Sequence, residues 1–272
     1  MEKTIKTCLF AIGVLAVAGL GCRAASPKVA LAEAPPPLIE PALAPESALV
    51  DKRAEELVRQ MSDLLAATPA FELEAEEVYD EVPEQSPLQQ LTSVRQVTLR
   101  RPDRLSGDTT GDAVNRAFWY DGRTFSVLDK EQFVWTDGTV PPSVDGALDW
   151  IFDKTGTVIP LADFLYADPY ARLMGDVQRG VYLGIHDAGG VPCHHLSFEQ
   201  ATIDWQIWID AGPKPLPRKL LIAYKTEDEV PQYTVMIRHW NLTPNVPDAR
   251  FRFTPPAAAK RIDVPALKEE GR

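Results

Sequence analysis

Cysteine is scarce in this chain, with three residues among 272: Cys8, Cys22 and Cys193. The first two lie in an N-terminal segment with the composition of a secretory signal. Once that segment is removed and Cys22 is used as described below, Cys193 has no intramolecular partner, even in a compartment that permits disulfides. Stability must therefore come from a packed core, and a globular part of about 220 residues is long enough to form one.

Long apolar runs are also missing. The uncharged stretch Cys8–Gly21 follows Lys3 and Lys6. It is too short to cross a bilayer, because a spanning helix needs about 20 apolar residues. Its length and its positive start are those of a secretory signal peptide.

The uncharged stretch ends in "AGLGC", which resembles a bacterial lipobox, where a cysteine after a small residue is lipidated. We therefore predict a signal peptide at residues 1–21 and lipidation of Cys22; secretion with cleavage after residues 16–18 is the alternative. The triacylated cysteine that the resemblance implies would anchor the protein stably, because several acyl chains hold where one is marginal. Arg23, rather than an aspartate, follows the cysteine and favours the outer membrane over the inner one.

Basic residues are fewer than acidic residues. The chain has a net charge of −11, and removal of residues 1–21 leaves 38 acidic and 26 basic residues, a net charge of −12. Nucleic acids and anionic membrane surfaces both require cationic patches on their partners. The composition therefore argues against nucleic acid as a partner, and it assigns membrane attachment to the lipid rather than to the protein surface.

Familiar catalytic motifs are absent from the sequence: there is no G-x-S-x-G, H-E-x-x-H, phosphate-binding loop, C-x-x-C or G-x-G-x-x-G. We predict no catalytic residue, no cofactor and no metal. One cluster keeps an alternative open, a metal-dependent or Cys/His hydrolase centred on Cys193 and His195, since both residue types bind zinc and can form nucleophilic pairs. On a strand, Cys193 and His195 share one face and His194 takes the other. A metal site would need His186 or His239 as a further ligand, so we favour a small buried cysteine beside structural histidines.

The chain is organised as a tether, one domain and a tail. Residues 22–50 are rich in alanine and proline, which predicts a semi-extended tether, and residues 257–272 look similarly loose. Between them lies the domain, residues 51–256. It begins with an amphipathic helix over residues 51–67, capped by Asp51, whose apolar residues recur at three- and four-residue spacing: Ala54, Leu57, Val58, Met61, Leu64 and Leu65.

After the helix the apolar period changes to two, which predicts an antiparallel sheet of about nine strands. In the first strand Phe71, Leu73 and Ala75 alternate with glutamates, and the second covers residues 91–105, whose Arg95, Arg100 and Arg101 we expect to pair with those glutamates. Residues 115–138 predict three strands with turns at Asp121-Gly122 and Asp137-Gly138, and a later hairpin turns at Gly189-Gly190. Two short helices, residues 143–156 and 160–175, interrupt the sheet; Leu148, Ile151 and Phe152 form the apolar face of the first, and Leu161, Phe164 and Leu165 that of the second.

Several segments carry a family resemblance. In order along the chain, "HHLSFEQATIDWQIWID", "KPLPRKLLIAYK", "PQYTVMIRHWN" and "FRFTPPAAAKRID" resemble the C-terminal half of the bacterial domain of unknown function 2092. This is a family of predicted periplasmic proteins, grouped with the LolA/LolB-like proteins. "FWYDGRTFSVLDKEQFVW" and "PLADFLYADPYARL" stand where that family has similar segments, so the resemblance covers roughly residues 52–262.

The resemblance implies an α+β fold: a strongly curved antiparallel sheet, an unclosed half-barrel, whose concave face is covered by the N-terminal helix and the mid-chain helices. Carriers with this fold bind acyl chains of lipoproteins between sheet and helices. The residues expected to line such a cavity are Leu57, Met61, Phe118, Tyr120, Phe125, Phe133, Phe164 and Trp205.

The function expected from these features is non-catalytic binding of a hydrophobic ligand, an acyl chain, a lipid or a lipoprotein, by a lipid-anchored protein on the periplasmic side of the bacterial envelope. Because aromatic residues are also ordinary strand residues, the concave face could instead be filled by its own side chains. The alternative is then an envelope scaffold or protein-interaction module without a ligand.

Overall fold

The computed structural model describes residues 49–83, 87–155, 161–226 and 230–263. The predicted signal peptide, Cys22 and nearly all of the tether lie outside these residues, as does most of the tail. The assignments made for them therefore remain predictions.

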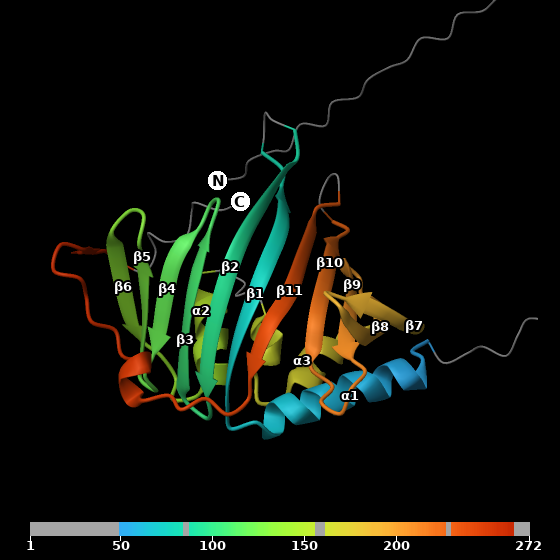
Figure 1. Cartoon of the computed structure of the whole chain (residues 1–272). Coiled ribbons are helices and arrows are strands. Elements are labelled where there is room, and N and C mark those ends of the chain that lie inside the picture. The colour runs from blue at the N-terminus through green and yellow to red at the C-terminus, as the bar shows by residue number, and fades with distance from the viewer. Residues whose placement is uncertain (1–48, 84–86, 156–160, 227–229, 264–272) are drawn as a thin grey trace, which may run out of the picture. The chain divides into compact units, whose positions relative to one another are not determined.

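A single large sheet dominates the described part of the chain (Figure 1). Its strands are β1 (Ala70–Glu81), β2 (Gln89–Arg100), β3 (Arg104–Gly111), β4 (Asn115–Tyr120), β5 (Thr124–Asp129), β6 (Val134–Thr139), β7 (Arg179–Ala188), β8 (Val191–Glu199), β9 (Ile203–Asp210), β10 (Pro217–Tyr224), β11 (Gln232–Asn241) and β12 (Lys260–Arg261). They lie in the order β12-β6-β5-β4-β3-β2-β1-β11-β10-β9-β8-β7.

The sheet is an unclosed half-barrel with β12 and β7 at its two ends. All neighbouring strands pair antiparallel except β12, which runs parallel to β6. Register shifts interrupt the ladders of β1, β7 and β10, at Glu74/Ala75, Tyr182/Gly184 and Pro217/Lys219. Such bulges bend a strand and increase its twist, which accounts for the strong curvature of the sheet.

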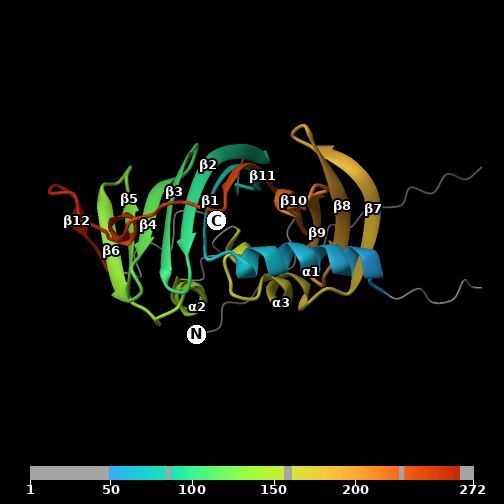
Figure 2. The ribbon, with the colours of Figure 1, turned by 60° about the horizontal axis from the view of Figure 1, so that its bottom comes forward.

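Three α-helices lie on the concave side of the sheet (Figure 2). They are α1 (Lys52–Ala67), α2 (Val144–Thr155) and α3 (Pro169–Met174), and a short 3₁₀ turn, η1 (Ala162–Phe164), precedes α3. Asp51 caps α1 as predicted, accepting a hydrogen bond of 2.7 Å from the backbone N–H of Arg53. Among the described residues no helix combines the length and the apolar character needed to cross a membrane.

One apolar cluster fills the space between sheet and helices. The α1 residues that face it, Ala54, Leu57, Val58, Met61 and Leu65, are buried, and so are the predicted inward positions of β1, Phe71, Leu73 and Ala75. Each large apolar side chain buried in this way contributes about 1.5–3 kcal/mol relative to an exposed position. The apolar residues at helical spacing in α1 and at alternate positions in β1 therefore form part of the core.

Two predictions about strands and turns were wrong. The stretch taken as one strand, residues 91–105, contains nearly all of β2 and the start of β3, so the sheet has more strands than expected. Asp121-Gly122 is a turn, with φ 95° at the glycine, but Asp137-Gly138 lies inside β6. The true β5–β6 turn follows Asp129, whose carboxylate accepts hydrogen bonds from the backbone N–H groups of Glu131 and Gln132.

Three details of the predicted helices and tail also differ. Phe152 of α2 is 55% exposed and does not share the buried face of Leu148 and Ile151. The second predicted helix is divided into η1 and α3, because the chain passes through the cap residue Asp168 before Pro169. In the segment expected to be loose, Lys260–Arg261 form β12, held by the Arg261 guanidinium on the Asp137 carboxylate.

Candidate functional site

The candidate site is the apolar interior of the half-barrel. Seven of the eight predicted lining residues belong to its cluster or pack against it, from α1, β4, β5, η1 and β9: Leu57, Met61, Phe118, Tyr120, Phe125, Phe164 and Trp205. The eighth, Phe133, lies in the β5–β6 turn with φ 57° and is 43% exposed, so it does not line the interior. The described interior is filled by these side chains, and an occupant would have to separate sheet and helices.

Two buried polar atoms in this region lack a hydrogen-bond partner among the described residues, the indole N–H of Trp205 and the hydroxyl of Ser62. Trp205 stacks against Phe198 with ring centroids 4.3 Å apart. A buried donor without a partner costs about 1–3 kcal/mol, and most buried polar groups in proteins are paired. The interior is thus lined by apolar side chains, but it holds two polar groups without a hydrogen-bond partner among the described residues.

A half-buried arginine joins the sheet to the helical layer. The Arg101 guanidinium, between β2 and β3, donates hydrogen bonds to three carbonyl oxygens, those of Leu165 at 3.0 Å, Tyr166 at 2.9 Å and Leu65 at 3.4 Å. Desolvation by burial lowers the pKa of Arg101 below its usual range. Arg101 therefore fastens both the end of α1 and the segment after η1, rather than pairing with the glutamates of β1 as predicted.

The other fastenings of the helical layer are also polar and few. The Tyr120 hydroxyl donates to the carbonyl of Pro141 ahead of α2 at 2.7 Å, and the Tyr170 hydroxyl on α3 donates to Glu55 on α1 at 2.8 Å. Burial raises the pKa of Tyr120 to about 12. These hydrogen bonds supplement the apolar cluster that the helices share with the sheet.

A buried ion pair on the inward face marks the end of the apolar lining. Glu77 follows Phe71, Leu73 and Ala75 at inward positions of β1, yet it is 2% exposed. Its carboxylate accepts hydrogen bonds from the Arg95 guanidinium at 2.5 Å, the Ser93 hydroxyl at 2.7 Å and the Tyr233 hydroxyl at 2.8 Å. Burial, and then the charge of Glu77, raise the pKa of Tyr233 well above its usual range.

The predicted charge pairing of Arg95 with the first strand is thus confirmed, although its partner is the inward-facing Glu77. Arg100, in contrast, pairs with Asp248 rather than with β1. A buried ion pair holds position more than it adds stability. Here the carboxylate of Glu77 joins β1 to β2 and β11 where the interior becomes polar.

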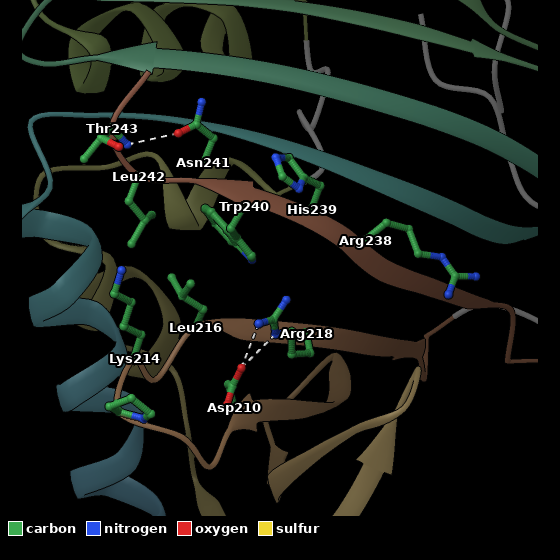
Figure 3. Close-up of a pocket in the computed structure, with 11 residues that line it drawn as sticks. Asp210, Lys214, Leu216, Arg218, Arg238, His239, Trp240, Asn241, Leu242 and Thr243 are labelled. Atoms are coloured by element: carbon green, nitrogen blue, oxygen red, sulfur yellow. Dashed lines mark hydrogen bonds and ion pairs between the residues drawn. The ribbon is translucent and has the colours of Figure 1, made fainter. Parts of the chain in front are cut away.

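A cavity of about 530 Å³ opens where β10 and β11 separate (Figure 3). The two strands pair only from Lys219↔Met236 to Ala223↔Gln232, whereas β11 continues along β1 as far as Asn241. The Trp240 indole N–H bridges the gap to the carbonyl of Pro217 at 3.0 Å. The residues around the cavity are Asp210, Pro213, Lys214, Leu216, Arg218, Arg238, His239, Trp240, Asn241, Leu242 and Thr243.

A second cavity of about 500 Å³ lies at the start of β7, where Val50 forms a parallel bridge to Gly180. It is lined by the backbone entering α1 and by the first residues of β7: Leu49, Val50, Asp51, Lys52, Arg179, Gly180 and Val181. None of these lining residues is a buried member of the core cluster.

The Cys/His cluster lies on the outer face of β8, as strand parity predicted. Cys193 and His195 share this face, and the Nδ1 atoms of His186 and His195 are 2.8 Å apart, so one ring donates and the other accepts. The Nε2 atom of His195 lies 2.9 Å from Gln206, and its ring stacks on Trp208 at 3.9 Å.

This geometry does not suit a zinc site or a nucleophile. Among the described residues no group of three or more His, Cys, Asp or Glu side chains could hold a metal ion, and His239 lies on β11, at the cavity. Burial raises the pKa of Cys193 to about 11, and its thiol donates to the carbonyl of Val191. A thiol with a raised pKa is a poor nucleophile at neutral pH.

Two functional features were not found from the sequence. In the sequence Arg101 was assigned to a strand as an ordinary surface arginine. Its position before Pro102 is the only local sign that it leaves the strand. The cavity at Trp240 depends on where β10 stops pairing with β11, for which the sequence has no local signal beyond the prolines before β10.

The fold is an unclosed antiparallel half-barrel with an apolar interior between sheet and helices. The chain belongs to the family described as predicted periplasmic protein, DUF2092, whose model matches residues 54–265. A search of curated proteins found no match.

The solved structures that are similar to this chain include the following three. The lipoprotein LppX of Mycobacterium tuberculosis is 13% identical over 72% of this chain and 100% of its own, with a TM-score of 0.47. An uncharacterized conserved protein of Thermus thermophilus is 8% identical, covering 78% and 99%, with a TM-score of 0.45. A LolA superfamily protein of Nitrosomonas europaea is 10% identical, covering 74% and 97%, with a TM-score of 0.35.

Proposed function

We propose that this protein binds the acyl chain of a lipid or lipoprotein between its curved sheet and its helical cover, without catalysis. One observation carries the proposal: the inward faces of the sheet and of the helices form one continuous apolar cluster, enclosed by a sheet that does not close. Burial of an acyl chain in such a lining yields about 0.8 kcal/mol for each CH₂ group.

Two further features support an acyl ligand. The unpartnered donors of Trp205 and Ser62 suit the carbonyl oxygen of an ester or amide, the group that joins an acyl chain to its lipid. The polar fastenings of the cover, such as Arg101 to Leu165, suit a layer that detaches from the sheet and returns. A ligand in this place would take over contacts that the interior side chains now make with one another.

A second candidate function has an observation in its favour. Met61, Phe71, Leu99 and Phe164 are at most 1% exposed, so the interior is filled by the protein's own side chains. A permanently filled half-barrel would serve as an interaction module of the envelope rather than as a carrier.

Binding of a fluorescent fatty acid separates the two functions. Under the first proposal the purified protein takes up the probe, and native mass spectrometry of protein purified from membranes shows bound lipid. Trp205→Phe keeps the buried ring but removes the N–H. It should weaken the binding of an acyl ester more than the matched change Trp135→Phe on β6 does. Protein that neither carries lipid nor takes up the probe would leave only the interaction module.

The attachment to the envelope belongs to the same proposal. Membership of this family agrees with a periplasmic location. Lipidation of Cys22 would hold the protein at a membrane, and Arg23, rather than an aspartate, after the cysteine favours the outer membrane. Cys22→Ala should move the protein from the membrane fraction to the soluble fraction. Retention of the variant in the membrane fraction would contradict lipid anchoring while leaving the ligand proposal standing.

A further inference from the structure

We infer that the cavity between β10 and β11 is a head-group site, which takes the anionic head of a single-chain amphiphile while the chain passes Trp240 into the interior. The inference rests on the proposed function and specifies where the ligand enters and which charge it carries. Four observations support it: the position of the cavity, the apolar residues of its floor, the charges on its rim, and the edge of β11 that has no ladder partner there among the described strands.

The floor of the cavity connects it to the interior. Leu216 is a buried member of the core cluster, and Trp240 and Leu242 pack against that cluster. The Trp240 ring also meets Phe71 of β1 edge to face, with centroids 5.3 Å apart. In Figure 3 Trp240 points from β11 across the gap toward Leu216. An alkyl chain that displaces the indole would therefore meet the apolar lining directly.

The rim of the cavity is cationic, although the chain as a whole is strongly acidic. Lys214, Arg218 and Arg238 line it against a single carboxylate, Asp210. Arg218 pairs with Asp210 at 2.7 Å, and Arg238 pairs with Glu76 outside the cavity at 2.5 Å. No ion pair involves Lys214 among the described residues, so its ammonium group is available to an anion.

The backbone at the gap adds polar groups. From His239 to Asn241 the β11 strand pairs with β1 on one side, and among the described strands it has no ladder partner on the β10 side. Backbone N–H groups on that side of a strand are strong donors that ordinarily find an acceptor. A carboxylate or phosphate supplies several acceptor oxygens, whereas a neutral hydroxyl head supplies few.

The test compares an anionic and a neutral amphiphile with the same chain, palmitate and 1-palmitoylglycerol, by isothermal titration calorimetry. Lys214→Glu should weaken palmitate binding about fivefold, because it replaces one attraction by a repulsion, and change palmitoylglycerol binding less than about twofold. The matched control, Lys260→Glu, makes the same charge change on β12, at the other edge of the sheet, and should leave both affinities unchanged. Lysophosphatidic acid should follow palmitate if the site recognises oxyanions in general.

A labelling experiment tests the path directly. Palmitate with a diazirine beside its carboxylate should label the peptide that contains Trp240 and Leu242, and a diazirine at the far end of the chain should label α1. Equal effects of Lys214→Glu and Lys260→Glu, or labelling at the cavity beside Val50 and Gly180 instead, would overturn the inference alone. A wild-type protein that binds neither amphiphile would overturn the proposed function and this inference with it.

Discussion

The guanidinium of Arg101 lies 3.0 Å from the carbonyl oxygen of Leu165, and this contact joins the β2–β3 turn to the helical layer. The same guanidinium also donates to the carbonyl of Leu65 at the end of α1, so Arg101 contacts both α1 and the residue that follows η1. Arg101 therefore contributes to the attachment of the cover, beside the apolar cluster and the hydrogen bonds of Tyr120 and Tyr170.

Replacement of Arg101 by methionine should loosen the cover. The carbonyl oxygens of Leu165 and Tyr166 would lose a charged donor, which should lower the free energy of unfolding by about 1–3 kcal/mol. Hydrogen exchange should quicken most over residues 161–174, and urea unfolding gives the stability. Arg123→Met, at an exposed position, is the matched control. Uniform exchange changes across the sheet and the cover would contradict the role of Arg101 as a local fastening.

Replacement of Met61 by alanine should create space in the interior. Met61 is fully buried on α1, so the loss of its side chain should lower the free energy of unfolding by about 2–5 kcal/mol. If the interior is the binding site, the same variant should bind a short-chain fatty acid more tightly than the wild type does, measured by fluorescence titration. Phe152→Ala, 55% exposed on α2, should change neither quantity. A destabilised Met61→Ala protein with unchanged affinity would favour the interaction module.

Alkaline pH should weaken the protein through Tyr120. Burial raises the pKa of this hydroxyl to about 12 in the folded state, against an ordinary value of about 10. The neutral phenol is thus favoured by folding: its contribution is complete below about pH 10 and is lost as the pH rises through about 12. Unfolding by urea across this alkaline range should show the loss, and Tyr120→Phe should reduce the slope. Identical slopes in both proteins would show that other groups cause the loss.

Acid pH should weaken the protein through His195. Burial lowers the pKa of this imidazole, outweighing its hydrogen bond with Gln206. Folding therefore favours the neutral ring, and its contribution is present above the ordinary value of about 6.5 and is lost as the pH falls. His195→Gln should flatten the dependence of stability on pH between about 7 and 5, measured by thermal unfolding. A pH dependence that is the same in the wild type and in His195→Gln would contradict the assignment.

Much of the fold could be predicted from local patterns. The three- and four-residue spacing from Ala54 to Leu65 defined α1 and its buried face, and the alternation from Phe71 to Ala75 defined the inward face of β1. Both patterns repeat within a few residues. They therefore indicate which face of the helix or strand is apolar, independently of what packs against that face. The buried faces of α1 and β1 follow from these patterns. The sequence left open whether the interior is filled, and the predicted lining residues came from the family resemblance.

The local turn signal at Asp137-Gly138 was misleading because contacts with other elements decide the structure there. Asp137-Gly138 has the composition of a turn, yet Gly138 lies in β6, where a Cβ atom would stand 3.0 Å from the ring of Trp150 on α2. The Asp137 carboxylate binds Arg261 of β12. The glycine makes room for a helix and the aspartate binds a strand, and neither partner is near in sequence.

The sequence by itself determined the family, the helix and strand faces, and an apolar interior between sheet and helices, because these depend on periodicity and on motifs that lie close together along the chain. Tertiary structure alone decided that Arg101 leaves the sheet to hold the cover, and that β10 and β11 separate above Leu216 and Trp240. Both depend on which strands stop pairing and where the sheet bends, and therefore on contacts between residues far apart in the sequence, which no local pattern records.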